Sequence, residues 1–348
     1  MPAVQVGIIG FGRIGAEHAA WLAEAHDIRP AAVFDQTPAR RELAESRGLR
    51  AYAALESMLA EPTIEAMLVA TPTAMHFEHA RKALEAGKHV LVEKPMTLDL
   101  PQAKALVAEA EKRHRVLSVF HNRRWDADYL TARAAVQAGF FGRVINIESR
   151  LGQFSSCVGP AAREWRPQWR NEASFGGGGL YDWGSHFVDQ IWRMMWPSKP
   201  VRLFAQLRGN VWTSDCDDFA RVCIDFDNGA VGLVEINTTT ARPLARWHID
   251  GIAGSASSPP SPTFDVNQWA KLEFTPADGG EIREIPRAGA GFGEREIWEQ
   301  FARAVRTGAA PAVTARSVLP TMALLDAARQ SSASGLAVDL RQGIEWVY

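Results

Sequence analysis

The feature that most constrains the fold of this chain is a glycine-rich turn between two apolar segments near its start. Residues Val4 to Ile9 form a short apolar run, typical of a buried strand, and the run ends at Gly10-Phe11-Gly12-Arg13-Ile14-Gly15. A helical pattern follows, and the apolar run Ala31 to Phe34 then ends at Asp35. Strand, helix and strand in this order form a βαβ unit, which predicts a parallel sheet.

The same alternation continues to about residue 121. Further strands are expected at residues 66–70, 89–92 and 116–120, and helices at residues 37–47, 77–86 and 100–113. Alternating strands and helices are typical of a doubly wound α/β sheet. Residues 1–121 are therefore expected to form a Rossmann-type domain.

The rest of the chain, residues 122–348, has a different pattern, and 348 residues are long for a single core. Apolar runs at residues 144–150, 201–208, 219–226, 230–237 and 247–252 follow one another with short turns. This pattern predicts a second, α+β domain with an open, mainly antiparallel sheet. Helices expected at residues 180–195, 294–306 and 317–332 would cover one face of it. Residues 254–262, with their Ser and Pro, are expected to form a loop.

The glycine turn has the spacing of a dinucleotide-binding motif. A glycine pattern alone is weak evidence, but this one follows a strand, opens a helix and is answered by an acidic residue at the end of the next strand. Gly10 permits the tight turn, Gly12 lets the backbone approach a pyrophosphate, and Gly15 lets the helix pack closely on the strand. The N–H groups of the segment Phe11-Gly12-Arg13-Ile14 would bind the phosphates at the helix N-terminus.

Asp35 favours NAD over NADP. Its carboxylate would accept hydrogen bonds from the ribose hydroxyls and repel the additional phosphate of NADP, and Gln36 supplies no positive charge. Arg40 and Arg41 could in principle reach a phosphate, but a solvated helix face is the simpler interpretation of them.

Two polar segments follow the third and fourth of these strands, at the sheet edge where doubly wound folds bind their ligands. In the first segment, Thr71 and Pro72 are expected to line the cofactor, and His76 to begin a helix beside it. The second segment is Glu93-Lys94-Pro95, and Glu93 and Lys94 are also expected among the cofactor-binding residues. The ammonium group of Lys94 would donate a hydrogen bond to a reacting oxygen and stabilise negative charge on it. A surface lysine beside a helix-starting proline is the alternative.

A third polar segment follows the four glycines at residues 176–179. If a helix starts at Leu180, Asp182 and His186 lie one turn apart on the same face. The carboxylate would then orient the imidazole and raise its basicity, so that His186 could remove a hydroxyl proton near neutral pH. The alternative is an Asp182 placed for the helix dipole and a buried, hydrogen-bonded His186. No zinc site is expected, because Asp182, His186 and a distant cysteine are not a closed ligand set.

In combination these segments resemble the Gfo/Idh/MocA oxidoreductases, the family of glucose-fructose oxidoreductase and inositol dehydrogenase. The resemblance extends over nearly the whole chain, and it implies a Rossmann domain followed by a larger α/β domain. It also implies that Lys94, Asp182 and His186 form the catalytic set. The matching segments, in chain order, are Gly10-x-Gly12-x-x-Gly15, Ala70-Thr71-Pro72, Glu93-Lys94-Pro95, Asn122-Arg123-Arg124-Trp125-Asp126 and Asp182-x-x-x-His186.

The resemblance further places Asn122 and Arg123 at the mouth of the substrate site, and residues 163–170 in a loop that shapes it. Trp165, Trp169 and Arg170 in that loop suit a polar, anionic or glycosidic substrate, although a subunit contact would use the same residues. The implied reaction is hydride transfer to NAD from a secondary hydroxyl of a sugar, an inositol-like polyol or a glycoside. Two alternatives remain open, namely NAD-dependent cleavage of a glycoside through transient oxidation and a non-catalytic, dinucleotide-binding regulator.

The composition excludes other classes of partner. With 38 basic and 40 acidic residues, no net field points to nucleic acid or to an anionic membrane. No apolar stretch is long enough to span a bilayer, and the strand expected just after Met1 leaves no room for a signal sequence. Cys157, Cys216 and Cys223 lack metal-type or redox spacing. We therefore expect a cytoplasmic protein with reduced thiols, a small carbohydrate substrate and no metal.

The second sheet also predicts self-association. The strands at residues 219–224 and 231–236 carry apolar side chains that would be left wet on the face without helices. Members of the family that the chain resembles commonly assemble through this sheet. This implies a homodimer or homotetramer with closed symmetry.

Overall fold

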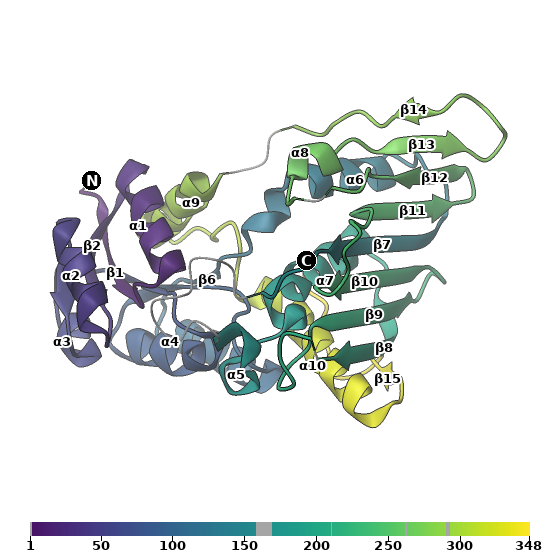
Figure 1. Ribbon diagram of the computed structural model, residues 1–348. Helices are drawn as coiled ribbons and strands as arrows, with labels where there is room; N and C mark the ends of the chain where they lie inside the picture. The colour runs from purple at the N-terminus through teal and green to yellow at the C-terminus, as the bar shows by residue number, and fades with distance from the viewer. Residues whose placement is uncertain (1, 158–168, 210, 262, 290–292) are drawn as a thin grey trace.

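The first sheet of the protein is parallel throughout (Figure 1). The structure is a computed structural model, and it describes residues 2–157, 169–209, 211–261, 263–289 and 293–348. Six strands lie in the order β3-β2-β1-β4-β5-β6, and every pairing between them is parallel. Because the order reverses between β1 and β4, the carboxyl ends of these strands form the ligand-binding edge. The bounds are Val4–Ile9 (β1), Ile28–Phe34 (β2), Arg50–Tyr52 (β3), Ala66–Val69 (β4), His89–Val92 (β5) and Leu117–Val119 (β6).

Helices cover both faces of this sheet, which confirms the doubly wound architecture. Helices α1 and α2 share a core with Val6 and Ile8 on one face, whereas α3, α4 and α5 share a core with Met67 and Val90 on the other. The short β3 and α3 have no counterpart among the predicted elements. The helices are α1 (Arg13–Glu24), α2 (Pro38–Ser46), α3 (Leu55–Leu59), α4 (His76–Glu85) and α5 (Leu100–Lys112).

The second sheet is mainly antiparallel, as predicted. Nine strands lie in the order β14-β13-β12-β11-β7-β10-β9-β8-β15. One pair, β7 and β10, is parallel, because the chain forms two other strands before it returns beside β7. The bounds are Val144–Gly152 (β7), Pro200–Arg208 (β8), Phe219–Phe226 (β9), Val231–Asn237 (β10), Trp247–Gly251 (β11), Gly254–Ser257 (β12), Glu273–Pro276 (β13), Arg283–Glu284 (β14) and Val338–Asp339 (β15).

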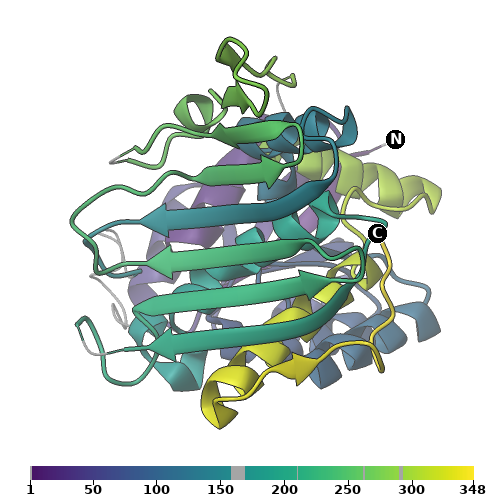
Figure 2. The same ribbon diagram turned by 90° about the vertical axis from the view of Figure 1, so that its right-hand side faces the viewer.

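Helices lie on one face of the second sheet. In Figure 1, α7 and α10 lie between the two sheets, and they contact β10 and β8 respectively. Figure 2 looks onto the opposite face of this sheet, where no helix crosses in front of the central strands. The helices of this part are α6 (Ala127–Gln137), α7 (Ser185–Met194), α8 (Val266–Trp269), α9 (Glu294–Thr307) and α10 (Leu319–Ser334).

Three predictions for this part of the chain are corrected, and the first concerns α9, which is expected from the sequence to cover the second sheet but packs on the first. The segment 254–262, expected as a loop, begins with strand β12, which pairs with β11 and β13. Burial alternates along this strand, with Gly254 and Ala256 buried and Ser255 and Ser257 partly exposed. Because the buried residues are small, the sequence shows no alternation of apolar and polar side chains. The helix expected at 180–195 begins with a π turn at Leu180–Gly184 before α7 starts.

Helix α9 returns to the first sheet although it follows the second sheet in sequence. Its residues Ile297, Trp298 and Phe301 are buried in the same core as α1. Near its end, Arg306 forms an ion pair with Glu65, beside the first sheet. The core of the first sheet is therefore completed by residues from near the end of the chain.

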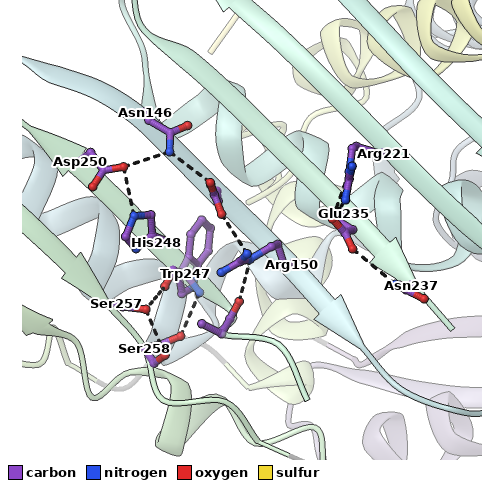
Figure 3. Close-up of polar contacts among 12 residues, drawn as sticks. Asn146, Arg150, Arg221, Glu235, Asn237, Trp247, His248, Asp250, Ser257 and Ser258 are labelled. Carbon is purple, nitrogen blue, oxygen red and sulfur yellow. Dashed lines mark hydrogen bonds and ion pairs between the residues drawn. The ribbon is translucent and has the colours of Figure 1, made fainter. Parts of the chain in front are cut away.

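The face of the second sheet without helices is largely polar, and Phe204 and Val231 on it are 39% and 38% exposed. The apolar residues Val222, Ile224, Val234 and Ile236 are all fully buried. A period of two turns their neighbours to the other face. Figure 3 shows polar contacts across this face, among them those of Arg221 with Glu235 and of Asn146 and His248 with Asp250. Arg150 also forms an ion pair with Glu148 at 3.1 Å.

Candidate active site

One cavity, of about 630 Å³, is lined by residues from both parts of the chain. Of the residues that the sequence singles out, Phe11 does not line it, because its side chain is fully buried in the core. Trp165 lies outside the described residues. The cavity is lined by the other predicted cofactor, substrate and catalytic residues, namely Gly10, Gly12, Arg13, Ile14, Asp35, Thr71, Pro72, His76, Glu93, Lys94, Asn122, Arg123, Trp169, Arg170, Asp182 and His186.

The glycine turn fits a dinucleotide because its backbone is closely packed and uncapped. Gly10 has a φ of 93°, which favours glycine, and a Cβ on Gly15 would lie 2.1 Å from the carbonyl oxygen of Gly10. Helix α1 starts after Gly12 without a capping side chain. Its first N–H groups therefore remain available to an anion at the positive end of the helix dipole.

Asp35 holds this turn in place. Its carboxylate accepts hydrogen bonds from the backbone N–H groups of Phe11 and Thr37, both at 2.8 Å. Arg40 donates to the carbonyl oxygen of Phe11, and its guanidinium lies beside Gly12 at the cavity wall. Arg41 donates instead to the backbone carbonyl of Asp35, and it does not line the cavity.

His76 braces the two segments that follow β4 and β5. Its ring nitrogens lie 2.9 Å from the carbonyl oxygens of Thr71 and Pro95, and the side chain is almost fully buried. This contact fixes the loop of Thr71 and Pro72 against the loop that carries Lys94.

Lys94 crosses the cavity to the second part of the chain. Its Nζ donates to the backbone carbonyl of Asp182 at 2.7 Å and lies 3.3 Å from Asp182 Oδ1. Arg170 Nε approaches the same oxygen at 3.5 Å. Burial acts to raise the pKa of Asp182, but the charges of Lys94 and Arg170 outweigh it and hold this pKa below its ordinary value. Asp182 is therefore ionised at neutral pH.

The predicted contact between Asp182 and His186 does not form. The carboxylate of Asp182 faces Lys94 and Arg170, and Nδ1 of His186 is buried with no hydrogen-bond partner. The π turn explains this result. Its i→i+5 hydrogen bonds widen the turn, so side chains four residues apart no longer lie one above the other as they do in an α-helix. His186 instead lies edge-on to His121, with ring centroids 5.5 Å apart. Burial, followed by the charges of Lys94 and Arg123, lowers the pKa of His186 well below its ordinary value.

Two arginines that line the cavity lie against aromatic rings. The Arg123 guanidinium lies 4.1 Å from the ring centroid of Phe264 and 5.0 Å from that of Trp183. The guanidinium of Arg170 lies 4.3 Å from the ring of Trp169. Such surfaces contact both the apolar faces and the hydroxyl edges of sugars.

The cavity also contains residues that sequence reasoning missed. Glu294, at the start of α9, accepts a hydrogen bond from Asn122 Nδ2 at 3.2 Å. Cys157 lies near Asp182, and burial raises the pKa of its thiol well above the ordinary value, so the neutral form prevails. Residues 153–157 could have been predicted as part of the site, because they directly follow β7 and ligand sites often lie at the ends of strands. No local signal marks Glu294. Other missed residues include Glu17, Trp21, Thr73, Met75, His79, Phe120, Gln153, Ser155, Ser156, Tyr181 and Trp183.

In the described part of the chain, no group of three or more His, Cys, Asp or Glu side chains could hold a metal ion. Over the same residues, no helix is both long and apolar enough to cross a membrane.

The fold and this cavity define an NAD(P)-dependent oxidoreductase. Residues 4–121 match the oxidoreductase family with an NAD-binding Rossmann fold, and residues 129–257 match the GFO/IDH/MocA C-terminal domain. The chain belongs to the Gfo/Idh/MocA family, whose members act on CH–OH groups.

Known relatives support this assignment. The uncharacterized oxidoreductase YdgJ of Escherichia coli is 34% identical over 255 residues, which are 72% of this chain and 70% of YdgJ. The scyllo-inositol 2-dehydrogenase (NADP(+)) IolW of Bacillus subtilis is 25% identical over 94% of both chains. The crystal structure of an NAD-binding protein from Listeria innocua has a TM-score of 0.86 at 27% identity, over 98% of both chains.

The close packing of Gly15 predicts the effect of a single methyl group. Gly15→Ala should weaken NAD(H) or NADP(H) binding about 10-fold or more, because the new Cβ would push α1 away from Gly10. Titration of NADH fluorescence measures this affinity. Gly289→Ala is the control, since Gly289, like Gly15, has no positive φ and a Cβ added there would meet no other atom within 4 Å. Wild-type affinity in the Gly15 variant would contradict the assignment.

Proposed function

We propose that this protein oxidises a secondary hydroxyl group of a sugar, an inositol-like polyol or a glycoside, with NAD as the hydride acceptor. The observation that carries the proposal is the meeting of Lys94, Asp182 and His186 in the cavity that also contains the glycine turn. The name of IolW, a scyllo-inositol 2-dehydrogenase, supports a polyhydroxylated substrate.

The proposed chemistry divides between the cofactor and the side chains. A bound nicotinamide dinucleotide supplies the hydride acceptor, and the glycine turn, Asp35, Thr71 and Pro72 would hold it. Nδ1 of His186 is buried, which leaves Nε2 to accept the hydroxyl proton of the substrate.

Lys94 and Asp182 complete the site. The ammonium group of Lys94 has three N–H donors, and Asp182 accepts from it at two atoms. A further N–H of Lys94 can therefore stabilise negative charge on the substrate oxygen. Both cations that contact the Asp182 carboxylate do so at Oδ1, so Oδ2 can accept a hydrogen bond from a neighbouring substrate hydroxyl.

Removal of the Lys94 ammonium group or of the His186 imidazole should abolish most turnover. Lys94→Ala and His186→Ala should each reduce kcat about 100-fold or more, with NAD affinity nearly unchanged, because neither residue belongs to the glycine turn. Steady-state kinetics and NADH titration measure the two quantities. Lys104→Ala, at an exposed position on α5, is the matched control. Near-native turnover in either variant would show that the catalytic assignment is wrong.

The pH profile should reflect the low pKa of His186. The base must be neutral, and burial and the charge of Lys94 keep it neutral to lower pH than an ordinary histidine. The acid limb of kcat/KM should therefore have its midpoint below about 6.5, the usual histidine value. Rates measured between about pH 5 and 8 test this. An acid limb at or above the ordinary value would contradict the proposed base.

We propose NAD as the preferred cofactor on the basis of Asp35. Its buried carboxylate would accept from the ribose hydroxyls and repel a phosphate, although IolW is named for NADP(+) and Arg40 lies nearby. Asp35→Ala should shift the ratio of kcat/KM for NAD over NADP about 10-fold or more toward NADP. Glu42→Ala, at an exposed position of α2, should leave the ratio unchanged. A wild-type preference for NADP would refute this interpretation.

The substrate class is tested by NAD reduction over polyols, free sugars and glycosides, with NADP in parallel. Sustained NADH formation with one of them supports the dehydrogenase. Release of a leaving group without net NADH would indicate glycoside cleavage by transient oxidation. Dinucleotide binding without turnover across the panel would indicate a regulator.

We further propose that a second copy of the chain covers the polar face of the second sheet. This face carries charges of both signs beside the partly exposed Phe204 and Val231, and such a mixed surface can be self-complementary across a two-fold axis. Light scattering should give the mass of a dimer or tetramer. Val231→Asp should lower this mass, whereas Leu43→Asp, at an exposed position of α2, should not. A wild-type monomer at micromolar concentration would contradict the proposal.

A further inference from the structure

His18 is a buried imidazole in the middle of α1, behind the wall of the cavity. Its side chain is fully buried, and three aromatic rings surround it, with centroids 4.8 Å (Trp21), 4.4 Å (Phe120) and 5.5 Å (Trp298) away. Both ring nitrogens are nevertheless hydrogen-bonded. Nε2 lies 2.7 Å from Oε1 of Glu93, and Nδ1 accepts from Nε1 of Trp298 at 3.0 Å.

The contact with Trp298 fixes the protonation of this ring. An indole nitrogen can only donate, so Nδ1 of His18 must be the acceptor and carries no proton. The proton of the neutral ring is then on Nε2, which donates it to Glu93. The contact between His18 and Glu93 is therefore a directed hydrogen bond from a neutral imidazole to a carboxylate.

Glu93 transmits this contact to the neighbouring residue. Its second carboxylate oxygen, Oε2, accepts the backbone N–H of Lys94 at 3.0 Å. Hydrogen bonds from His18 and from the backbone N–H of Lys94 stabilise the ionised form of this carboxylate. An ionised Glu93 thus binds α1 through one oxygen and the backbone of Lys94 through the other.

We infer that His18 is a positioning residue for Lys94, and that Trp298 holds it in the required tautomer. The inference rests on the proposed role of Lys94 in oxidising an alcohol. Helix α1, which starts at the glycine turn, is joined through His18 and Glu93 to the backbone of Lys94. Lys94 is the residue proposed to bind the reacting oxygen. A displacement of about 1 Å at a catalytic group can cost an enzyme about 100-fold in rate. We therefore expect that loss of this connection to Lys94 lowers kcat and leaves cofactor affinity nearly unchanged.

Two substitutions at His18 separate positioning from packing. His18→Gln keeps an N–H donor near the place of Nε2, and kcat should stay within about threefold of wild type. His18→Leu keeps apolar volume without the donor, and kcat should fall about 10- to 100-fold while NADH affinity and the KM for the alcohol stay nearly constant. His89→Leu is the matched control on β5, where the histidine accepts from Val116 away from the cavity, and kcat should not change. Wild-type kcat in His18→Leu, or equal losses in both His18 variants, would overturn the inference.

The tautomer of His18 is tested without any substrate. Long-range ¹H–¹⁵N spectra of the cofactor-free protein should show a protonated Nε2 and an unprotonated Nδ1, with the resonances assigned by their loss in His18→Gln. Trp298→Phe should shift the Nδ1 resonance toward an average of tautomers. An Nδ1–H tautomer in the wild-type protein would overturn the inference. If no alcohol is oxidised while the Nε2–H tautomer is found, the proposed function fails and the hydrogen-bond chain stands.

Discussion

The contact between Lys94 and Asp182 is the interaction on which the rest of the site depends. Lys94 follows a strand of the first sheet, Asp182 precedes the helix that covers the second, and less than a fifth of each side chain is exposed. Either charge alone would be costly to withdraw from water, whereas together they offset much of that cost. The relative position of the two sheets is thereby coupled to the charge state of the groups between them.

The two halves of the cavity differ in what forms them. Around the glycine turn, contacts are made largely by backbone, as with the N–H groups of α1 and the carbonyl groups braced by His76. On the opposite side they are made by side chains, such as Arg123 and Arg170 beside aromatic rings. Backbone recognition changes little when residues are replaced, whereas side-chain recognition changes with each substitution. This division lets one scaffold keep its cofactor while its alcohol substrate varies.

Local sequence patterns predicted those parts of the structure that depend on neighbours in the chain. The turn from Gly10 to Gly15 could be placed because strand, glycines, helix and acidic residue follow in order, and Lys94 because strand ends share an edge. Its contact with Asp182 required the second sheet to be positioned, and the orientation of His186 depended on a π turn that helical periodicity does not reveal. Strand β12 was missed because its buried positions are Gly254 and Ala256. The link from His18 to Trp298 spans most of the chain, so no local pattern predicts it.

The return of α9 to the first sheet has a consequence for how the protein is made. Ile297, Trp298 and Phe301 complete a core whose other members come mostly from the first hundred residues. A ribosome that has released the whole dinucleotide-binding sheet has therefore not yet released all the residues that cover the face on which α1 and α2 pack. Until α9 emerges, the part of this core that α1 and α2 do not cover is exposed to water or to a chaperone. Full burial of His18 also requires α9, because Trp298 packs against it. The environment of His18 is therefore completed only after most of the chain has been synthesised.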